Sequence, residues 1–377
     1  MTMLTRRRLL TSATATALLP LMGRLTLAAA EGDNRFVCII LRGGMDGLDV
    51  VRPVGDPAYA ALRPEAGADA NVDLDGHFAM HPALGPLEPM FRDRQLSFVH
   101  AVATPYRERS HFAGQDVLEQ GGNDRGLHDG WLNRMLGLVP KARAVDIGTG
   151  ESMLLSGREP VKNWYPEIET DLKSDSYQFL EALYADDAEL SRALTGIETD
   201  SGKSMAGDDT DKGVSNAEVA RLAGRFLTQE SRIAAFSIAG WDTHIQQKVR
   251  LARQLGELAK SLLALRDALG PVWAKTAVVM CSEFGRTARY NGAGGTDHGT
   301  GGLAILAGGL LANGQGGKVL GSWPGLSALY EDRDLMPTSD VRMYLASLCA
   351  DLFAIDRSSI ASTVFPGLDL VSPVKLI

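Results

Sequence analysis

The sequence predicts an α/β fold in which a mostly parallel central sheet carries helices on both faces. Continuous apolar runs rich in β-branched residues, such as Phe36–Leu41 and Ala277–Met280, are typical of parallel strands covered on both faces. Leucines spaced three and four residues apart from Leu251 to Leu269 predict a long amphipathic helix packed on such a sheet. The chain has 377 residues, 45% of them apolar, so residues 31–377 can form one domain with a large core.

The first 30 residues predict a targeting segment. Residues 5–10 form a twin-arginine pattern, and the apolar stretch over 11–23 is too short and too weak to span a membrane. Because Ala28–Ala30 fits the small-residue cleavage rule, the mature chain is expected to begin at Glu31. We therefore expect export by the twin-arginine machinery to the periplasm or beyond, with no stable membrane span in the mature chain. An uncleaved N-terminal anchor is the alternative.

The remaining elements alternate between apolar runs and helical stripes. Residues 52–95 are expected to form an irregular excursion with short helices, and the polar stretch Asp200–Gly213 an exposed insertion loop around 198–214. Further strands are predicted at Leu96–Val102, Ile233–Ile238 and Leu303–Ala307, with a short strand within 141–170 and a small hairpin over Gly317–Trp323. Further helices are predicted at Ala113–Gln120, from Leu127, at Asp175–Leu194 and over 341–353.

The charge and cysteine content exclude several classes of partner. The net charge is −8, and the first 30 residues contain four arginines and no acid, so the mature chain is more acidic still. Such a chain is a poor ligand for nucleic acid or an anionic membrane, although a bound cation could still attract an anionic substrate. Cys38, Cys281 and Cys349 are too few and too far apart for a disulfide framework, and are expected to be buried.

Acids and histidines recur just after the predicted strands. Glu283 ends one strand and Asp297 and His298 lie in the glycine-rich loop beyond it, while Asp242 and His244 follow another strand. Asp46, or alternatively Asp49, follows the first strand in a glycine-rich turn. Because ligands bind beyond the carboxyl ends of the strands in open α/β sheets, these six residues are candidate ligands of a divalent metal ion. A set of solvated turn residues is the alternative for each of them alone.

Ser110 is predicted at the start of a helix. Its hydroxyl could cap the helix, or it could act as a nucleophile at a helix end that favours a bound anion. Arg109 and His111 beside it favour an anion-handling loop.

The sequence resembles the uncharacterised "domain of unknown function 1501" family. The matching stretches are LRGGMDGLD, RSHFAGQD, DGWLNRM, GWDTH, SEFGRT and GGTDHGTGG, which together span nearly all of the mature chain. That family looks like a branch of the alkaline phosphatase and sulfatase superfamily, which implies a mostly parallel sheet and metal-dependent hydrolysis of phosphate or sulfate esters. The resemblance implies that Asp46, Asp242, His244, Asp297 and His298 bind metal, with Glu283 as an alternative to Asp297, and that Ser110 is the nucleophile. It departs from the superfamily in one respect: no histidine follows His298, so a two-zinc, three-histidine site cannot be assembled in the usual order.

Two hypotheses follow. In the first, the protein is an exported metal-dependent hydrolase of small anionic esters, with Zn²⁺, Mn²⁺, Ca²⁺ or Mg²⁺ as the ion, Ser110 as nucleophile, and Arg109 or His111 binding the anion. In the second, it is a non-catalytic periplasmic binding or assembly protein on the same scaffold. A serine hydrolase is disfavoured because the chain contains no Gly-x-Ser-x-Gly motif.

Overall fold

The computed structural model describes residues 33–64, 66, 70–124, 126–148, 152–165, 214–369 and 374–377. The predicted signal segment, the helix predicted over Asp175–Leu194 and all but the last residue of the polar loop around 198–214 lie outside these residues. In the part of the chain that is described, no helix combines the length and the apolar character needed to cross a membrane.

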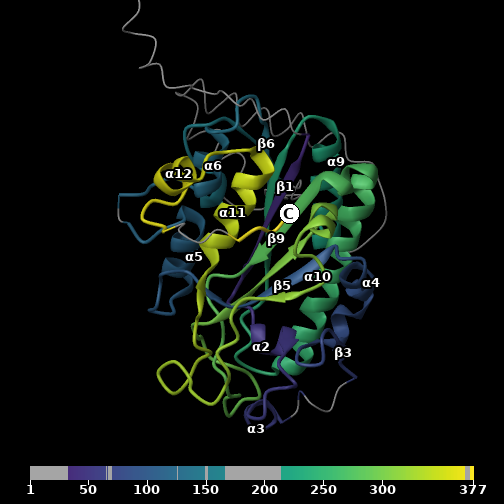
Figure 1. Ribbon diagram of the computed structural model, residues 1–377, viewed down its shortest axis with the longest axis vertical. Coiled ribbons are helices and arrows are strands. Elements are labelled where there is room, and N and C mark those ends of the chain that lie inside the picture. The colour runs from purple at the N-terminus through teal and green to yellow at the C-terminus, as the bar shows by residue number, and fades with distance from the viewer. Residues whose placement is uncertain are drawn as a thin grey trace, which may run out of the picture.

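The described residues form a nine-stranded, mostly parallel sheet, which confirms the predicted fold class (Figure 1). Strands β9, β1, β8, β6 and β7 lie side by side and run parallel. The strands span Arg35–Arg42 (β1), Leu96–Ala103 (β5), Ala144–Ile147 (β6), Val161–Trp164 (β7), Ile233–Ala239 (β8), Thr276–Cys281 (β9), Gly302–Ala307 (β10), Val319–Leu320 (β11) and Ser339–Asp340 (β12).

The antiparallel part of the sheet begins at β10, which pairs with β9 on one side and β5 on the other. The hairpin predicted over Gly317–Trp323 is wrong, because β11 in this segment pairs in parallel with β5. A second, three-stranded sheet is formed by Val51–Arg52 (β2), Ala79–Met80 (β4) and Val72–Asp73 (β3), within and next to the segment predicted as irregular, and the sequence did not indicate it.

Helices cover both faces of the sheet because alternate side chains of each strand point to opposite faces. Phe36, Cys38 and Ile40 pack with α5, α6 and α11, while Val37 and Ile39 pack with α9 and α10. Figure 1 shows these two helical layers on either side of the strands. The helices span Gly47–Val50 (α2), Tyr59–Leu62 (α3), Glu88–Arg92 (α4), His111–Gln120 (α5), Trp131–Leu136 (α6), Asn216–Gln229 (α9), Gln247–Leu269 (α10), Val341–Phe353 (α11) and Arg357–Ser359 (α12).

Several local predictions are confirmed. Helix α10 buries Leu251, Leu255, Leu258, Leu262 and Leu265, the leucine stripe read from the sequence. The three cysteines are buried and free of disulfides. Helix α9 was not predicted. It begins with a capping box in which the Ser215 hydroxyl accepts from the Glu218 N–H and the Glu218 carboxylate accepts from the Ser215 N–H.

Candidate metal centre

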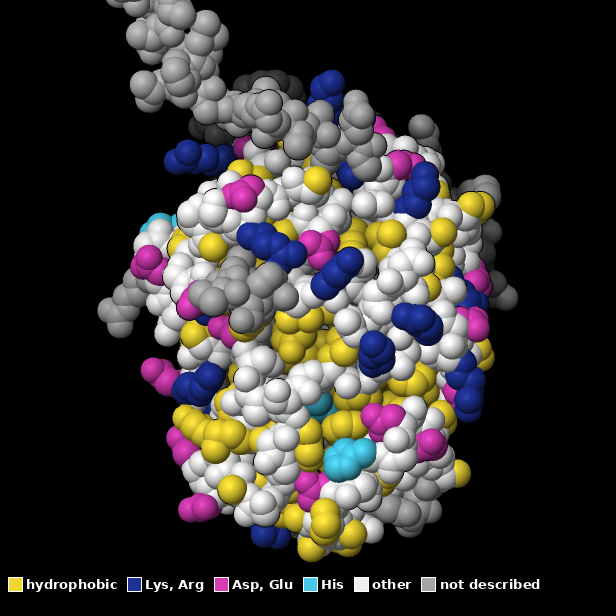
Figure 2. Space-filling view, viewed as in Figure 1, with side chains coloured by type: hydrophobic (Ala, Val, Ile, Leu, Met, Phe, Trp, Pro, Cys, Tyr) yellow, Lys and Arg dark blue, Asp and Glu magenta, His cyan; other side chains and the backbone are white. Residues whose placement is uncertain are grey.

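The polar residues singled out in the sequence lie in loops at the carboxyl ends of β1, β8 and β9 and at the start of α5. In Figure 2, histidine side chains are exposed in the lower half of the face, where Figure 1 shows the loops beyond the strand ends.

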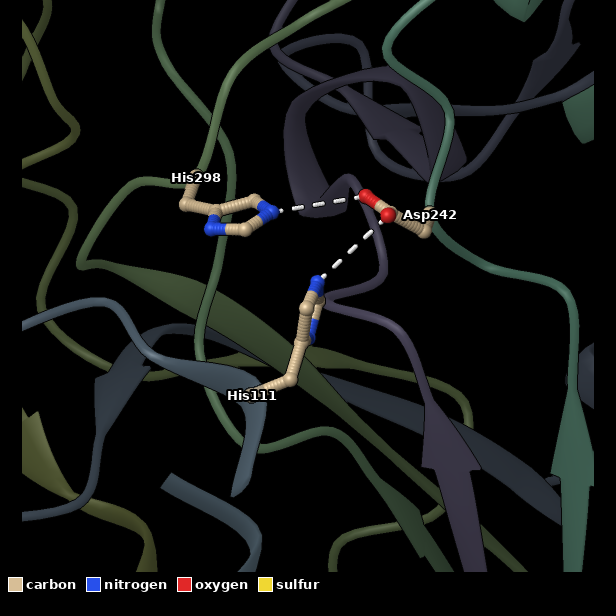
Figure 3. A group of neighbouring side chains, drawn as sticks. All are labelled: His111, Asp242 and His298. Atoms are coloured by element: carbon tan, nitrogen blue, oxygen red, sulfur yellow. Dashed lines mark ion pairs between the residues drawn. The ribbon is translucent and has the colours of Figure 1, made fainter. Parts of the chain in front are cut away.

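Three side chains from separate loops converge at this edge. His111, Asp242 and His298 each direct one ligand atom to a common point, and these atoms all lie within 4.8 Å of one another (Figure 3). The Nε2 atom of His111 lies 3.6 Å from Asp242 Oδ2, and the Nε2 atom of His298 lies 3.4 Å from Asp242 Oδ1. His111 is the first residue of α5, Asp242 follows β8, and His298 lies in the β9–β10 loop.

His244 adds a fourth donor beside this group. Its Nε2 atom lies 3.1 Å from Asp242 Oδ1 and 2.9 Å from His298 Nε2. We call His111, Asp242, His244 and His298 the histidine group.

The other ring nitrogen of each imidazole is held by an oxygen that only accepts. His298 Nδ1 donates to the backbone carbonyl of Arg109 at 2.8 Å. His111 Nδ1 lies 2.7 Å from the Glu283 carboxylate. The third imidazole, that of His244, has its Nδ1 atom 3.2 Å from the Asp297 carboxylate.

In the neutral form, these contacts leave the Nε2 lone pair of each imidazole directed at Asp242. The Nε2 atom of His111 is buried and has no hydrogen-bond partner, which is unusual for a buried polar atom. Lone pairs of two imidazoles 2.9 Å apart beside a carboxylate repel one another unless a proton or a metal ion lies between them.

The spacing is short enough for the ligand atoms to share one metal ion. One ligand atom from each of His111, Asp242 and His298 lies within 4.8 Å of the others, and His244 Nε2 lies 2.9 Å from His298 Nε2. A carbonyl or carboxylate oxygen behind each imidazole is also the arrangement that fixes histidine ligands in metal sites.

Glu283 is the fully buried member of this outer layer. Its carboxylate accepts from His111, Gln115 and Ser282 side chains and from the Gly43 N–H. Burial alone would raise the pKa of Glu283, but the hydrogen bonds from His111, its own backbone, Gln115 and Ser282 outweigh it and hold the pKa below its usual value. The same contact with Glu283 raises the pKa of His111, against the opposing effect of burial.

The pKa values of Asp242 and His298 are both lowered. Burial would raise the pKa of Asp242, but its hydrogen bond with Arg286 is decisive and the carboxylate is ionised near neutrality. Burial lowers the pKa of His298, so its imidazole favours the neutral form that binds metal.

Arg286 ties the loops of the site together, and no sequence pattern singled it out beyond its place in SEFGRT. Its buried guanidinium donates to backbone oxygens of Gly43, Gly44, Trp241 and Thr296 and to Asp242 at 2.5 Å. The chain approaches itself closely here, since a Cβ on Gly43, whose φ is +123°, would lie 2.6 Å from the Asp242 backbone nitrogen. Arg286 thereby fixes Asp242 in position.

Asp46 does not join the histidine group, although it was predicted as a metal ligand. Its Oδ1 atom caps α2 by accepting from the Leu48 N–H. Its Oδ2 atom accepts from Arg63 at 2.8 Å and from Gln247 at 2.6 Å. The sequence could not reveal this, because Arg63 and Gln247 come from distant segments.

The predicted anion-handling residues are placed differently. The guanidinium of Arg109 is paired with Asp334 at 2.8 Å and Glu331 at 2.5 Å, so its charge is neutralised, and only its carbonyl reaches the histidine group. Ser110 is exposed at the N-cap of α5 but its hydroxyl makes no capping hydrogen bond. His111, predicted to help bind the anion, lies within the histidine group. No histidine follows His298 in the sequence, and His111, which precedes it, provides the third imidazole of the group.

Two clefts flank the group. One, of about 460 Å³, is lined by Lys248, Arg289, Tyr290 and Asn291 among others, and Asn291 donates to Asp297 and to the His244 carbonyl. The other, of about 490 Å³, lies beside α5 and reaches Glu283 through Gln115.

Comparison with known proteins gives a family and distant structural likenesses. The profile of the family described as "Protein of unknown function (DUF1501)" matches residues 97–346. No curated protein matches the sequence.

Similar solved structures include the zinc complex of the C-terminal periplasmic domain of EcEptC from Escherichia coli. It is 9% identical, with a TM-score of 0.45, over 92% of this chain and 89% of that one. A protein of the alkaline phosphatase superfamily from Vibrio parahaemolyticus is 11% identical over 92% and 72% of the two chains, with a TM-score of 0.44. Alkaline phosphatase from the Antarctic bacterium TAB5 is 9% identical over 74% and 90%, with a TM-score of 0.37. Likenesses this distant carry no inference about the reaction.

Proposed function

The chain belongs to the DUF1501 family of proteins of unknown function, and from that premise we propose that it is a metal-dependent hydrolase of phosphate or sulfate esters. The observation that carries the proposal is the convergence of three imidazole lone pairs on one carboxylate, with the buried His111 Nε2 atom lacking a hydrogen-bond partner. A bound cation relieves the repulsion among these atoms and satisfies that nitrogen.

The donor set favours zinc among the candidate ions. Three imidazoles and one carboxylate suit Zn²⁺ and similar transition metals, whereas Ca²⁺ and Mg²⁺ prefer sites made of oxygen ligands. His111, Asp242, His244 and His298 would hold the ion, while Glu283 and Asp297 would orient two of the imidazoles. When bound, such an ion stabilises negative charge on a phosphoryl or sulfuryl oxygen and lowers the pKa of a neighbouring hydroxyl or water.

We propose Ser110 as the nucleophile. Its side chain is exposed, is not used as a helix cap, and directly precedes His111. The serine oxygen would bond to phosphorus or sulfur as the bond to the alcohol oxygen breaks. The alcohol leaves with a proton, and water then cleaves the serine ester to release phosphate or sulfate.

The flanking basic cleft supports an anionic substrate. Lys248 and Arg289 line it, and Asn291 joins it to His244 and Asp297. Two positive side chains at the site of a chain with a net charge of −8 raise the local concentration of small anions, although the protein as a whole repels them.

Metal content and turnover test the proposal together. We expect the exported protein to contain about one zinc ion per chain by elemental analysis, and the His111→Ala/His298→Ala protein to contain none. Ser110→Ala should retain the metal and lose ester turnover by about a thousandfold or more. A metal-loaded Ser110→Ala protein with full turnover would remove Ser110 from the reaction.

A non-catalytic binding or assembly role is the second candidate. It is favoured by the internal pairing of Asp46 with Arg63 and of Arg109 with Asp334, because both predicted site residues are already neutralised. It predicts that the protein binds metal but hydrolyses no ester in a broad panel supplied with Zn²⁺, Mn²⁺, Ca²⁺ or Mg²⁺. One efficiently hydrolysed ester would exclude it.

We also propose that the protein is exported by the twin-arginine machinery. The motif and the cleavage pattern of the first 30 residues support this. Replacing Arg6 and Arg7 with lysine should leave the protein in the cytoplasm, and N-terminal sequencing of exported protein should begin at Glu31. Export that is unaffected by the double replacement would contradict the proposed route.

A further inference from the structure

The second cleft beside the histidine group has a lining unlike that of the basic cleft. It has a volume of about 490 Å³ and lies between α5 and the carboxyl ends of β6 and β8. Its floor includes Ser237 and Ala239 of β8, which are exposed although they lie on a strand of the central sheet. The sheet is therefore left open here.

The cleft adjoins the proposed metal centre directly. Gln115 lines it and donates to the Glu283 carboxylate, which in turn contacts His111. Phe112 lines it from the residue next to His111, and Ala239 lies three residues before Asp242. The cleft lining and the histidine group therefore share the start of α5 and the chain just after β8.

The charge of the lining disfavours a second anionic group. The one guanidinium of the lining, that of Arg42, is paired with Glu119 at 2.6 Å and also donates to Gln115. Asp116 and Asp146 are the other charged side chains of the lining besides the Arg42–Glu119 pair, and neither forms an ion pair with any residue that the structure describes. A phosphate, sulfate or carboxylate in this cleft would meet acids without a free cation.

The remaining lining is suited to hydroxyl groups. Ser152, Ser156 and Ser237 offer hydroxyls that both donate and accept, and Gln115 and the two acids add further hydrogen-bonding positions. Phe112 is 86% exposed, so its ring offers a flat apolar face to a ligand at the cost of remaining in water when the cleft is empty.

We propose that this cleft binds an uncharged, polyhydroxylated group, a sugar or polyol, as the alcohol portion of the ester. The inference rests on the proposed function for its chemistry, since the ester group itself would lie at the histidine group. Phe112 would pack against the ring or carbon chain, and the serines and carboxyl groups would bond its hydroxyls. The substrate class is thereby narrowed to monoesters of sugars or polyols.

The protonation of Asp146 agrees with this assignment. Burial, and secondarily the nearby Glu119, raise the pKa of Asp146 to about 7. Near neutrality its carboxyl group can therefore either donate to or accept from a ligand hydroxyl, which suits a neutral polyol better than a fixed charge would.

Substrate preference and cleft variants test the proposal. We expect kcat/KM for glucose and glycerol monophosphates or monosulfates to exceed that for nitrophenyl phosphate. Ser237→Phe, which fills the cleft, and Phe112→Ala, which removes the ring, should each lower kcat/KM for the sugar esters about tenfold or more. Turnover of nitrophenyl phosphate, which does not need the cleft, should change less than about twofold.

The matched control is Ser327→Phe. Ser327 is also exposed but does not line the cleft, so the same change should alter neither substrate. Because Phe112 is almost fully exposed, its alanine variant remains informative even if Ser237→Phe fails to fold. Equal loss on sugar and aryl esters, or no loss on either, would overturn the proposal, as would a preference for choline phosphate over the sugar esters.

Binding without turnover separates this proposal from the proposed function. Methyl glucoside and methyl galactoside binding can be measured by saturation-transfer NMR on the metal-loaded full chain. Binding that is abolished by Phe112→Ala and Ser237→Phe, in a protein that hydrolyses no ester, would support the cleft and refute the hydrolase. Hydrolysis of esters without any glycoside binding or sugar preference would do the reverse.

Discussion

Two groups of charged side chains lie beyond the same edge of the sheet, and the charges of their acids are compensated differently. In the first, which we call the buried ion network, Asp46 pairs with Arg63 and Asp49 with Arg52, each at 2.8 Å and with side chains at most 3% exposed. In the histidine group, Asp242 is 46% exposed and faces imidazoles that offer lone pairs.

The difference is in what the surroundings supply. Each acid of the buried ion network receives a guanidinium and the Gln247 amide, so its charge is neutralised within the protein. In the histidine group Arg286 reaches only Asp242, and the imidazole N–H donors are used on outer oxygens, so the inner imidazole nitrogens lack a positive partner. An acid after a strand end therefore indicates a metal ligand where imidazole lone pairs face it, as at Asp242, and not where arginine and amide donors surround it, as at Asp46.

The largest expected effect comes from breaking the buried ion network. Arg63→Met should lower the free energy of unfolding by about 3–5 kcal/mol, because Asp46 is left buried and uncompensated. Urea denaturation measures this. Arg63→Met/Asp46→Asn should recover much of the loss, since it removes both charges. If Arg63→Met alone lowered the free energy of unfolding by less than about 1 kcal/mol, Arg63 would not be neutralising Asp46.

That contrast explains how much of the centre was predictable. The strand-end pattern identified five of the residues now placed in or against the group, Asp242, His244, Glu283, Asp297 and His298, because parallel strands bring their ends to one edge. The same pattern assigned Asp46 to the metal, and the helix start at Ser110 assigned His111 to the anion, because a sequence does not reveal which distant side chain lies opposite. Arg63 and Arg286 decide those positions, and both act through tertiary contacts alone.

Unlike the buried ion network, the histidine group should raise the free energy of unfolding only when a metal ion is added. Zn²⁺ at a hundred times its Kd should stabilise the wild-type protein by about 2.7 kcal/mol. His298→Ala should abolish this gain while leaving the metal-free protein nearly as stable, since it also removes a lone pair that faces His244. Thermal unfolding with and without Zn²⁺ checks both. A zinc-induced gain that persists in His298→Ala would place the ion elsewhere.

The two carboxylates behind the imidazoles should differ in importance. Glu283 is fully buried and lies 2.7 Å from His111, whereas Asp297 is 52% exposed and lies 3.2 Å from His244. Glu283→Gln should weaken zinc binding about 10–100-fold, as loss of such an outer partner does in other metal sites. Asp297→Asn should weaken it less than about tenfold, because water can replace an exposed partner. Competition titration with a chelating dye measures both, and a larger effect at Asp297 would reverse this ranking.

Asp146 is a third case, a carboxyl group near the same sheet edge whose pKa burial raises although the Arg42 guanidinium nearby opposes the rise. Burial, with a smaller contribution from Glu119, raises its pKa from 3.8 to about 7, so between these values the folded state holds a proton that the unfolded state releases. The stability that its neutral form provides is fully present below about pH 4 and is lost as the pH rises through 7.

Asp146→Asn cannot ionise and should be more stable than wild type by about 1 kcal/mol at about pH 8, since partial exposure screens the full shift. The two proteins should converge near about pH 4.5 in urea denaturation, and Asp116→Asn, an exposed change in the same cleft, should change stability by less than about 0.5 kcal/mol. Wild-type and Asp146→Asn profiles that stay parallel across this range would mean that a partner neutralises Asp146 after all, and its place would then be beside the buried ion network.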